Sequence, residues 1–435
     1  MDFSTRTKLN IGRLTKKAAR LRGGGSALPG LIIEKLDPHF LKRTLADLPR
    51  GVVVISGTNG KTTTTKMVAQ LLEAQGLKVF TNPTGSNFTR GVAAALIDQV
   101  DPVTGQLDAD IAVLELDEAH AVHFIRQVKP DYSLILNVLR DQLDRFGEID
   151  HTAKLLAKVV ESTRSGVVLN REDPLVLRLK DNVPDDVKLQ YFGLNPDLKD
   201  QFPSDQSLRG TYQADAPDRL PPLHRKDTIL ERLDGRQAVF AFGSKPQPPV
   251  SLKLDGLYNV LNAAAALGLV RLILGDEADD AKLLTELATV KPAFGRGEAV
   301  ELNDGKLEIV LVKNPSGFRL SLKSYLDSPA ATMICINDNY ADGRDMSWLW
   351  DVDFDQFADP DKLGVMTVSG IRAYDMALRL QYDGVLVGHI ETNLEKALRQ
   401  FLTDTTGQRR VYTTYTAMLE LRRILAKHHQ LEAIG

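Results

Sequence analysis

Residues 55–63 have the types and the order of residues that a phosphate-binding loop requires. The segment is Ile55-Ser56-Gly57-Thr58-Asn59-Gly60-Lys61-Thr62-Thr63. Its glycines let backbone N–H groups curl around phosphate oxygens, Lys61 would neutralise the β- and γ-phosphates, and Thr62 would ligate Mg²⁺. Ile55 stands where the longer form of this motif has its first glycine. The segment predicts a site for a nucleoside triphosphate; the alternative is a plain turn between a strand and a helix.

A second set of candidate residues lies at Val113–Glu118, where acidic side chains end an apolar run. Ligands gather at the carboxyl ends of parallel strands, so a carboxylate there is well placed to hold Mg²⁺, directly or through water. Strand alternation would put Glu115 and Asp117 on one side and turn Glu118 away. We predict Glu115 as the metal carboxylate; the alternative is an exposed acidic turn.

Charged residues also follow the next predicted strand. Arg140, Asp141, Asp144 and Arg145 fall within six residues of one another. Such a cluster is often a set of surface ion pairs, but its place at another strand end also favours a role in the site. The residues alone leave both interpretations open.

The composition is that of an ordinary globular protein of two or three domains. The chain has 435 residues, and 54 Lys and Arg against 57 Asp and Glu give a net charge of -3, which gives no support to a nucleic-acid-binding protein. The single cysteine, Cys335, cannot form an internal disulfide or a multi-thiolate zinc site. Because the chain has no stretch of about 20 apolar residues and no signal-peptide core at its N-terminus, we expect a cytoplasmic protein.

Strand and helix patterns alternate over residues 51–290, the first predicted domain, which indicates an α/β fold with a parallel sheet. A predicted strand at Val52–Ser56 and a predicted helix at Lys61–Ala74 hold the phosphate loop at its two ends. Further strands are expected at 78–81, 111–116, 132–138 and 166–169, and a long helix at 257–274. Residues 194–250 contain many prolines and few apolar runs, so we expect an irregular insertion there, with a hairpin around Asp234-Gly235.

A second α/β domain is expected at residues 295–435, after a boundary near 285–297. Its predicted strands are 307–312, 333–336, 365–369, 384–387 and 411–414, and its predicted helices are 372–381, 394–402 and 417–427. Residues 1–50 lead into the first domain, and among residues 1–24 seven Lys and Arg face one Asp. Apolar residues recur there at helical intervals, so we expect a helix that either packs by its apolar stripe or lies on an anionic membrane surface.

Taken together, the motifs resemble the Mur ligase superfamily, the ATP-dependent enzymes that form amides in cell-wall synthesis and folate polyglutamylation. Beside the phosphate loop and Glu115, the resemblance rests on Asp141–Arg145, Asn170–Pro174, Gly256–Asn262 and Gly295–Glu298. It implies ATP and Mg²⁺ as cofactors and a central P-loop ATPase domain followed by a Rossmann-like C-terminal domain. It also implies nucleotide contacts from Asn259, Asn262 and Arg296.

Two departures narrow the resemblance. Gln142 stands where most Mur ligases have His, and the phosphate loop begins too early for their N-terminal substrate domain. With Arg140–Asp150, Lys313–Gly317 and Asn337–Asp351, these departures make the chain similar to the MurT subfamily, the ligase-like subunits of lipid II isoglutaminyl synthases. Many members carry a four-cysteine zinc ribbon in the central domain. Residues 194–250 contain no Cys, so we expect no zinc site.

The subfamily implies amidation of the α-carboxylate of D-glutamate in the lipid II stem peptide, through an acyl phosphate, with Lys61 and Glu115 in catalysis. Ammonia would come from a GatD-type glutaminase subunit, because Cys335 lies in an apolar run where a buried, inert thiol is expected. The resemblance makes Asp345 the third member of the partner's Cys–His triad. The alternative for Asp345 is to cap its own loop, and Asp338, Asp342 and Asp351 are then the fallback candidates.

Other interpretations stay open. The chain could be a Mur or folylpolyglutamate-type ligase that joins an amino acid and works alone, or a nucleotide-gated scaffold subunit without chemistry. The only tryptophans, Trp348 and Trp350, belong either to the core or to a partner contact. A lipid-linked substrate would also bring the enzyme to the inner face of the cell membrane.

Overall fold

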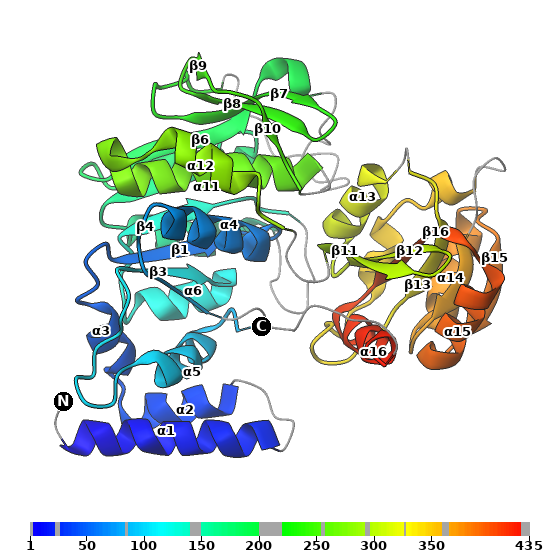
Figure 1. Cartoon of the computed structure of the whole chain (residues 1–435), viewed down its shortest axis with the longest axis horizontal. Helices are drawn as coiled ribbons and strands as arrows, with labels where there is room; N and C mark the ends of the chain where they lie inside the picture. The colour runs from blue at the N-terminus through cyan, green and yellow to red at the C-terminus, as the bar shows by residue number, and fades with distance from the viewer. Residues whose placement is uncertain are drawn as a thin grey trace.

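The computed structural model describes residues 3–21, 27–82, 86–139, 149–199, 220–253, 257–291, 296–325, 328–358 and 365–427. The chain forms two α/β lobes that lie side by side (Figure 1). The larger lobe, blue to green in Figure 1, carries the predicted phosphate loop, and the smaller lobe, yellow to red, carries the Asp345 segment. The expected α/β class with parallel sheets is confirmed.

The sheet of the larger lobe has the order β10-β8-β7-β6-β5-β4-β1-β3-β2, with β9 paired to β8. Its strands from β7 to β2 run parallel to their neighbours. All five residues of β1 are buried, which explains the continuous apolar run in the sequence. The strands are β1 Val52–Ser56, β2 Val79–Thr81, β3 Ile111–Glu115, β4 Tyr132–Ile135, β5 Gly166–Asn170, β6 Lys188–Leu194, β7 Thr228–Asp234, β8 Gln237–Phe242, β9 Lys245–Pro246 and β10 Val250–Ser251.

Helices cover both faces of this sheet (Figure 1). On one face α4, α11 and α12 share a core with the strands, and on the other face α5, α6 and α8 complete two further cores. The helices are α1 Phe3–Leu21, α2 Ala27–Leu36, α3 Phe40–Leu45, α4 Lys61–Ala74, α5 Thr89–Gln99, α6 Glu118–Ile125, α8 Ile149–Glu161, α9 Pro174–Arg178, α11 Leu257–Leu274 and α12 Asp280–Leu287, with short 3-10 turns at Leu179–Asn182, Pro196–Leu198 and Gly275–Glu277. The predicted helices at 61–74 and 257–274 have the bounds of α4 and α11.

The segment α11 to Glu277 is the one part of the described chain that is long and apolar enough to cross a membrane. Most of it is buried inside the fold, against α4 and strands β5, β6 and β7. Its apolar side chains are therefore buried in the core of this lobe.

The expectation of an irregular insertion at 194–250 is wrong for the described part of that segment. Residues 228–251 extend the main sheet through β7, β8, β9 and β10, and only the hairpin was expected. Gly235 makes its turn with a φ of 56°, a conformation that glycine adopts without steric cost. The described prolines of this segment lie in a short edge strand, a 3-10 turn and connections, where a missing N–H is tolerated, so they do not exclude a sheet.

The sheet of the smaller lobe has the order β11-β12-β16-β13-β14-β15, parallel except for β11. Its strands are β11 Arg296–Leu302, β12 Gly305–Leu311, β13 Ala331–Cys335, β14 Val365–Ser369, β15 Val387–Glu391 and β16 Gly407–Thr413. Helices α13 Pro315–Ser324 and α14 Ala373–Tyr382 contribute to one core, and α15 Leu394–Asp404 and α16 Tyr415–Leu425 to the other; 3-10 turns η4 and η5 lie at Ser347–Asp351 and Asp355–Phe357. The strand predicted at 384–387 lies further along the chain in the structure, as β15 at Val387–Glu391.

Candidate active site

The loop Gly57–Gly60 connects the carboxyl end of β1 to the first turn of α4. Gly57 and Gly60 have φ values of 127° and 89°, which L side chains rarely adopt. A Cβ atom on Gly60 would lie 2.7 Å from Nδ2 of Asn262, so α11 closes directly on the loop. The loop therefore has the backbone-lined cradle that a phosphate group needs, and the two glycines are required for it.

Asn137, which follows β4, clamps this loop from the neighbouring strand. The backbone N–H of Asn59 donates to Oδ1 of Asn137 at 2.8 Å, and Nδ2 of Asn137 donates to the carbonyl of Asn59 at 3.0 Å. Thr58 is held by the same segment, since its N–H donates to the Asn137 carbonyl at 3.0 Å. The sequence analysis assigned no role to Asn137. Its place at a strand end beside β1 was the available signal.

Lys61, the first residue of α4, is buried, with 3% of its surface exposed. Its ammonium group donates to the carbonyls of Gly57 at 2.6 Å and Thr58 at 3.2 Å, and it lies 3.1 Å from a carboxylate oxygen of Asp117. The positive charge thus sits inside the curve of the loop, where a phosphate would meet it. Asp117 is a residue of this site that the sequence analysis did not assign.

Thr62 and Glu115 lie together on the same side of the loop. The Thr62 hydroxyl donates to Oε1 of Glu115 at 2.8 Å. Asn82 fixes the backbone of Glu115, since its Oδ1 accepts from the Glu115 N–H at 2.9 Å and its Nδ2 donates to the Glu115 carbonyl at 3.0 Å. Strand β3 ends at Glu115, so Asp117 reaches Lys61 from the start of α6 and not by strand alternation.

The donor set fits Mg²⁺. A carboxylate and a hydroxyl are hard oxygen ligands, and Mg²⁺ commonly keeps waters and substrate phosphates beside one or two carboxylates. The described residues contain no cluster of three or more His, Cys, Asp or Glu that could hold a metal ion by themselves. Thr62 and Glu115 are thus the residues that would hold the ion, together with the nucleotide.

A cleft between the lobes lies next to the loop. Asn259 and Asn262, both from α11, line it beside Tyr258, as the sequence analysis expected for the adenine side. The smaller lobe supplies the opposite wall through Leu311, Lys313, Gly317, Leu320, Ser321 and Tyr325. The cleft is open to solvent on one side, and asparagine side chains of one lobe face a lysine and a tyrosine of the other across it.

Asn314 joins the two lobes at the floor of this cleft and is fully buried. Its Nδ2 donates to Oδ1 of Asn59 at 3.2 Å, while its own Oδ1 accepts from the N–H of Gly317 at 2.7 Å and so caps α13. The Nδ2 of Asn59 is buried and has no hydrogen-bond partner among the residues that the structure describes. An unsatisfied buried donor is costly, and a bound nucleotide would supply an acceptor for it.

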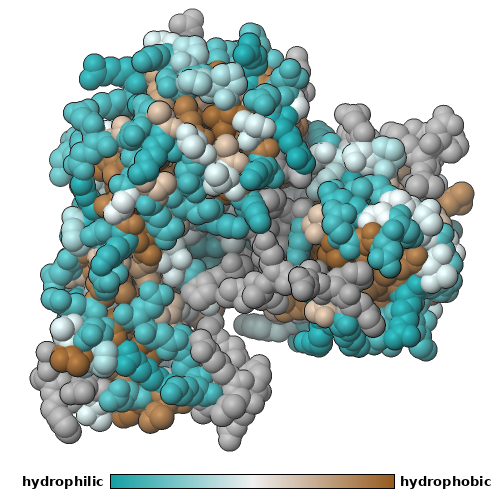
Figure 2. Space-filling view, viewed as in Figure 1, coloured by the Kyte–Doolittle hydropathy of each residue, from teal (hydrophilic) through white to brown (hydrophobic). Residues whose placement is uncertain are grey.

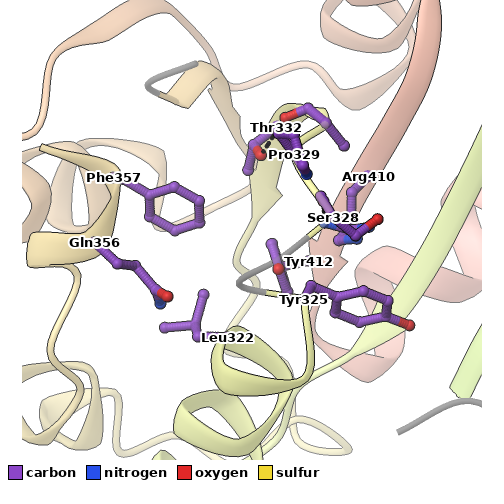
Figure 3. A pocket seen from close by; sticks show the side chains of 10 residues that line it. Leu322, Tyr325, Ser328, Pro329, Thr332, Gln356, Phe357, Arg410 and Tyr412 are labelled. Carbon is purple, nitrogen blue, oxygen red and sulfur yellow. Dashed lines mark hydrogen bonds between the residues drawn. The ribbon is translucent and has the colours of Figure 1, made fainter. Parts of the chain in front are cut away.

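A smaller pocket lies behind the cleft wall (Figure 3). Tyr325 belongs to both, and the Arg410 guanidinium lies over its ring at 3.7 Å. Arg410 is itself paired with Glu308 at 2.8 Å, so its charge is compensated. The stacking of Arg410 on Tyr325 therefore holds a residue that also lines the cleft.

Asp345 does not line the cleft; it lies in the loop between β13 and η4. One of its carboxylate oxygens accepts from the N–H of Ser347 at 2.9 Å. Two of the three fallback candidates are more strongly engaged: Asp342 is buried and accepts from both the N–H and the hydroxyl of Thr416, and Asp338 pairs with Arg372 at 2.7 Å. Burial raises the pKa of Asp342.

Several predicted site residues cannot be placed in this geometry. Residues 140–148, which include Asp141, Gln142, Asp144 and Arg145, lie outside the described residues. Arg296 is described only as the first residue of β11, without its side chain. Thr63, predicted beside the nucleotide, is buried within α4.

Comparison with known proteins decides the family. The curated MurT subunit of the glutamine-hydrolysing lipid II isoglutaminyl synthase of Streptococcus pneumoniae is 30% identical to this chain over 453 aligned positions, which cover 98% of each protein. The chain belongs to the MurT family. The corresponding subunit of Staphylococcus aureus strain COL is also 30% identical, over 95% of each chain. Within this chain, the Mur ligase middle-domain model matches residues 55–270 and the MurT ligase C-terminal model matches residues 311–418.

Solved structures show the same fold. MurF from Acinetobacter baumannii superposes with a TM-score of 0.65 at 17% identity, covering 91% of this chain and 81% of that one. A MurF ligase from Thermotoga maritima, solved in complex with ADP, gives 0.64 at 18% identity, covering 92% and 84%. The Mur ligase fold and the MurT membership agree with the motifs quoted from the sequence.

Proposed function

We propose that this MurT-family chain is the ligase subunit of a lipid II isoglutaminyl synthase. It converts the α-carboxylate of D-glutamate in the stem peptide of lipid II to an amide, with ATP as the energy source. The similarity to MurT subunits over 98% of the chain carries this proposal. The arrangement of Lys61, Thr62 and Glu115 supports it, because these residues suit phosphoryl transfer.

The chemistry follows from the geometry of the loop. A carboxylate resists attack because of its charge and resonance, so ATP first converts it to an acyl phosphate. Lys61, held in the loop by Asp117, stabilises the charge that develops on the transferred phosphoryl group. Mg²⁺, held by Thr62 and Glu115, would neutralise phosphate charge. Ammonia then attacks the acyl carbon and phosphate leaves.

The ammonia must come from another subunit. Glutamine hydrolysis by a nucleophilic residue needs an activated thiol or hydroxyl beside a base. Cys335, the only cysteine, is fully buried in β13, and burial raises the pKa of its thiol, so the reactive thiolate does not form near neutral pH. The MurT relatives are named as subunits of glutamine-hydrolysing enzymes. A GatD-type glutaminase is therefore the proposed partner.

The smaller lobe exposes an aromatic face that suits such a partner. Tyr374, Leu378 and Tyr382 are spaced four residues apart on α14, and they are 68%, 49% and 71% exposed. Trp350, on η4, stacks edge-on against Tyr382 with ring centroids 5.1 Å apart, whereas Trp348 is buried in the core. Tyr and Trp dominate the energetic centres of protein interfaces.

This face is continuous with the Asp345 loop. Asp345 lies two residues before η4, and η4 contacts α14. A glutaminase docked on the aromatic face would thus lie beside Asp345, whose carboxylate could orient the partner's catalytic His. Leu378→Glu should abolish co-purification with the glutaminase, while Leu223→Glu, the same change at an exposed residue of the other lobe, should not.

One reaction tests the proposed function directly. The purified complex is incubated with lipid II, ATP and glutamine, and lipid II is then analysed by mass spectrometry. The product should be lighter by the difference between OH and NH₂, and only when ATP is present. Incorporation of an amino acid in place of ammonia would instead support a ligase that works alone.

A further inference from the structure

Helix α1 is fixed to the larger lobe by one face. Leu9 is buried, and the Arg13 guanidinium donates to the carbonyls of Ile97 at 3.0 Å and Val100 at 2.6 Å. Lys16 donates to the carbonyl of Ala94 at 2.6 Å and pairs with Asp98 at 2.7 Å. Arg13 thus satisfies carbonyls at the C-terminal end of α5 and Lys16 contacts its middle, so rotation of α1 about its axis would break these contacts.

The opposite face of α1 exposes two apolar side chains beside Thr7. At about 100° per residue, Ile11 and Leu14 both point away from the side of Leu9, and they are 41% and 67% exposed. Lys8 and Lys17 lie on the two flanks of this outer face, one on each side. The helix does pack against the lobe, but through Leu9, Arg13 and Lys16, and not through the whole apolar stripe that the sequence predicted, because Ile11 and Leu14 are exposed.

The surroundings extend this pattern. Helix α2 packs against α1 and adds two exposed leucines, Leu28 and Leu36. Both helices form the outer edge of the larger lobe, at the bottom of Figure 1, and Figure 2 shows apolar residues along that edge. Residues 1–50 carry eleven Lys and Arg against four Asp and Glu, in a chain whose net charge is -3. The sequence of this segment is thus net positive in a chain that is net negative.

We infer that the outer face of α1 docks on an anionic lipid bilayer. A helix with an apolar stripe flanked by lysines lies in the membrane interface, where the stripe enters the acyl boundary and the lysines meet anionic headgroups. The described residues of this face include no Trp or Tyr, unlike the face on α14, so it lacks the residues that centre a protein interface. Its purpose rests on the proposed function, since docking would bring the cleft to a lipid-linked substrate.

Vesicle co-sedimentation of the full-length protein tests this inference. Wild type should bind vesicles of phosphatidylcholine mixed with phosphatidylglycerol more strongly than vesicles of phosphatidylcholine alone, and high salt should weaken the binding. Leu14→Glu should lower the partition coefficient by about tenfold or more, because an apolar side chain is replaced by a charge. Lys8→Ala and Lys17→Ala should each lower it by about fivefold.

Leu223→Glu and Lys245→Ala, the same changes at exposed residues of the larger lobe away from α1, serve as controls and should bind as wild type. Wild-type binding by Leu14→Glu, or equal binding to both kinds of vesicle, would overturn the inference. The assay needs no ATP, glutamine or partner. Failure of membrane docking is therefore distinguishable from failure of the proposed function, which is read separately as the ATP-dependent mass change of lipid II.

Discussion

At the scale of single residues, the phosphate loop is an internally balanced ionic site. The Lys61 ammonium and the Asp117 carboxylate are both buried and lie 3.1 Å apart. Each compensates the other when no phosphate is present, so the loop keeps its shape before substrate arrives. The lysine is the residue that phosphoryl transfer needs, and the aspartate is the residue that makes its burial tolerable.

Lys61→Ala should therefore have two separable effects. Turnover of ATP-dependent amidation should fall by about 10²–10³, because a charge that stabilises the transition state is lost. Stability should fall as well, by about 3–5 kcal/mol, because the buried carboxylate of Asp117 loses the positive charge of Lys61. Steady-state kinetics measure the first effect and thermal or denaturant unfolding measures the second.

The double variant Lys61→Ala/Asp117→Asn is the matched control. It removes both charges, so it should recover most of the stability lost by Lys61→Ala and none of the turnover. Near-normal amidation by either variant would contradict the role of Lys61. Unchanged stability of the single variant would show that Asp117 is compensated by other groups.

At the scale of elements, local patterns predicted what lies on one continuous segment. The helix at 61–74 was read correctly because an apolar face, a glycine before it and a glycine after it all lie within the segment. Contacts between segments that are distant in the chain could not be predicted from these local patterns. Asn59 and Asn314 are 255 residues apart in the chain, and only the fold brings their amides together.

The strand predicted at 384–387 shows how a local pattern can also give a wrong position. Leu386 made 384–387 look like a strand, yet it is 84% exposed, and β15 begins one residue later as a half-exposed edge strand. An edge strand packs only part of its surface, so its sequence does not carry the apolar signal of a buried strand. Similarly, Glu115 was predicted from its strand end, but Asp117 and Asn137 depend on which strands flank β1.

Asn314, which caps α13, should also affect nucleotide binding. Asn314→Ala removes the cap, which costs about 1 kcal/mol of stability, and also the bond to Asn59 across the cleft. We expect the KM for ATP to rise by about two- to tenfold, the value of one neutral hydrogen bond. Enzyme kinetics at varied ATP, beside an unfolding curve, measure both quantities.

Asn393→Ala is the matched control, because Asn393 caps α15 by the same kind of bond, to the N–H of Lys396 at 3.0 Å. It should lose similar stability without any change in the KM for ATP. Equal KM values for the two variants would mean that the Asn59–Asn314 contact does not affect nucleotide binding.

At the scale of the whole molecule, the two lobes meet at the carboxyl ends of parallel strands. The phosphate loop follows β1 and Asn314 follows β12, and their contact joins the sheets across the cleft. The Asp345 loop follows β13 of the same parallel set as β12. The contact of Asn314 with the phosphate loop and the proposed glutaminase contact near Asp345 therefore both follow parallel strands of the smaller lobe's sheet, at the same edge of that sheet.

This division predicts that Asp345 serves one nitrogen source and not the other. Asp345→Asn keeps the shape of the side chain and removes its charge, so the partner's His would lose its orienting anion. With glutamine, the complex carrying Asp345→Asn should make little amidated lipid II. With high free ammonium it should recover much of its activity, because Lys61, Thr62 and Glu115 are untouched. Asp355→Asn, at an exposed carboxylate after η4, should behave as wild type with both sources. Loss of activity with both sources, in a complex that still assembles, would place Asp345 in the ligase reaction or in folding.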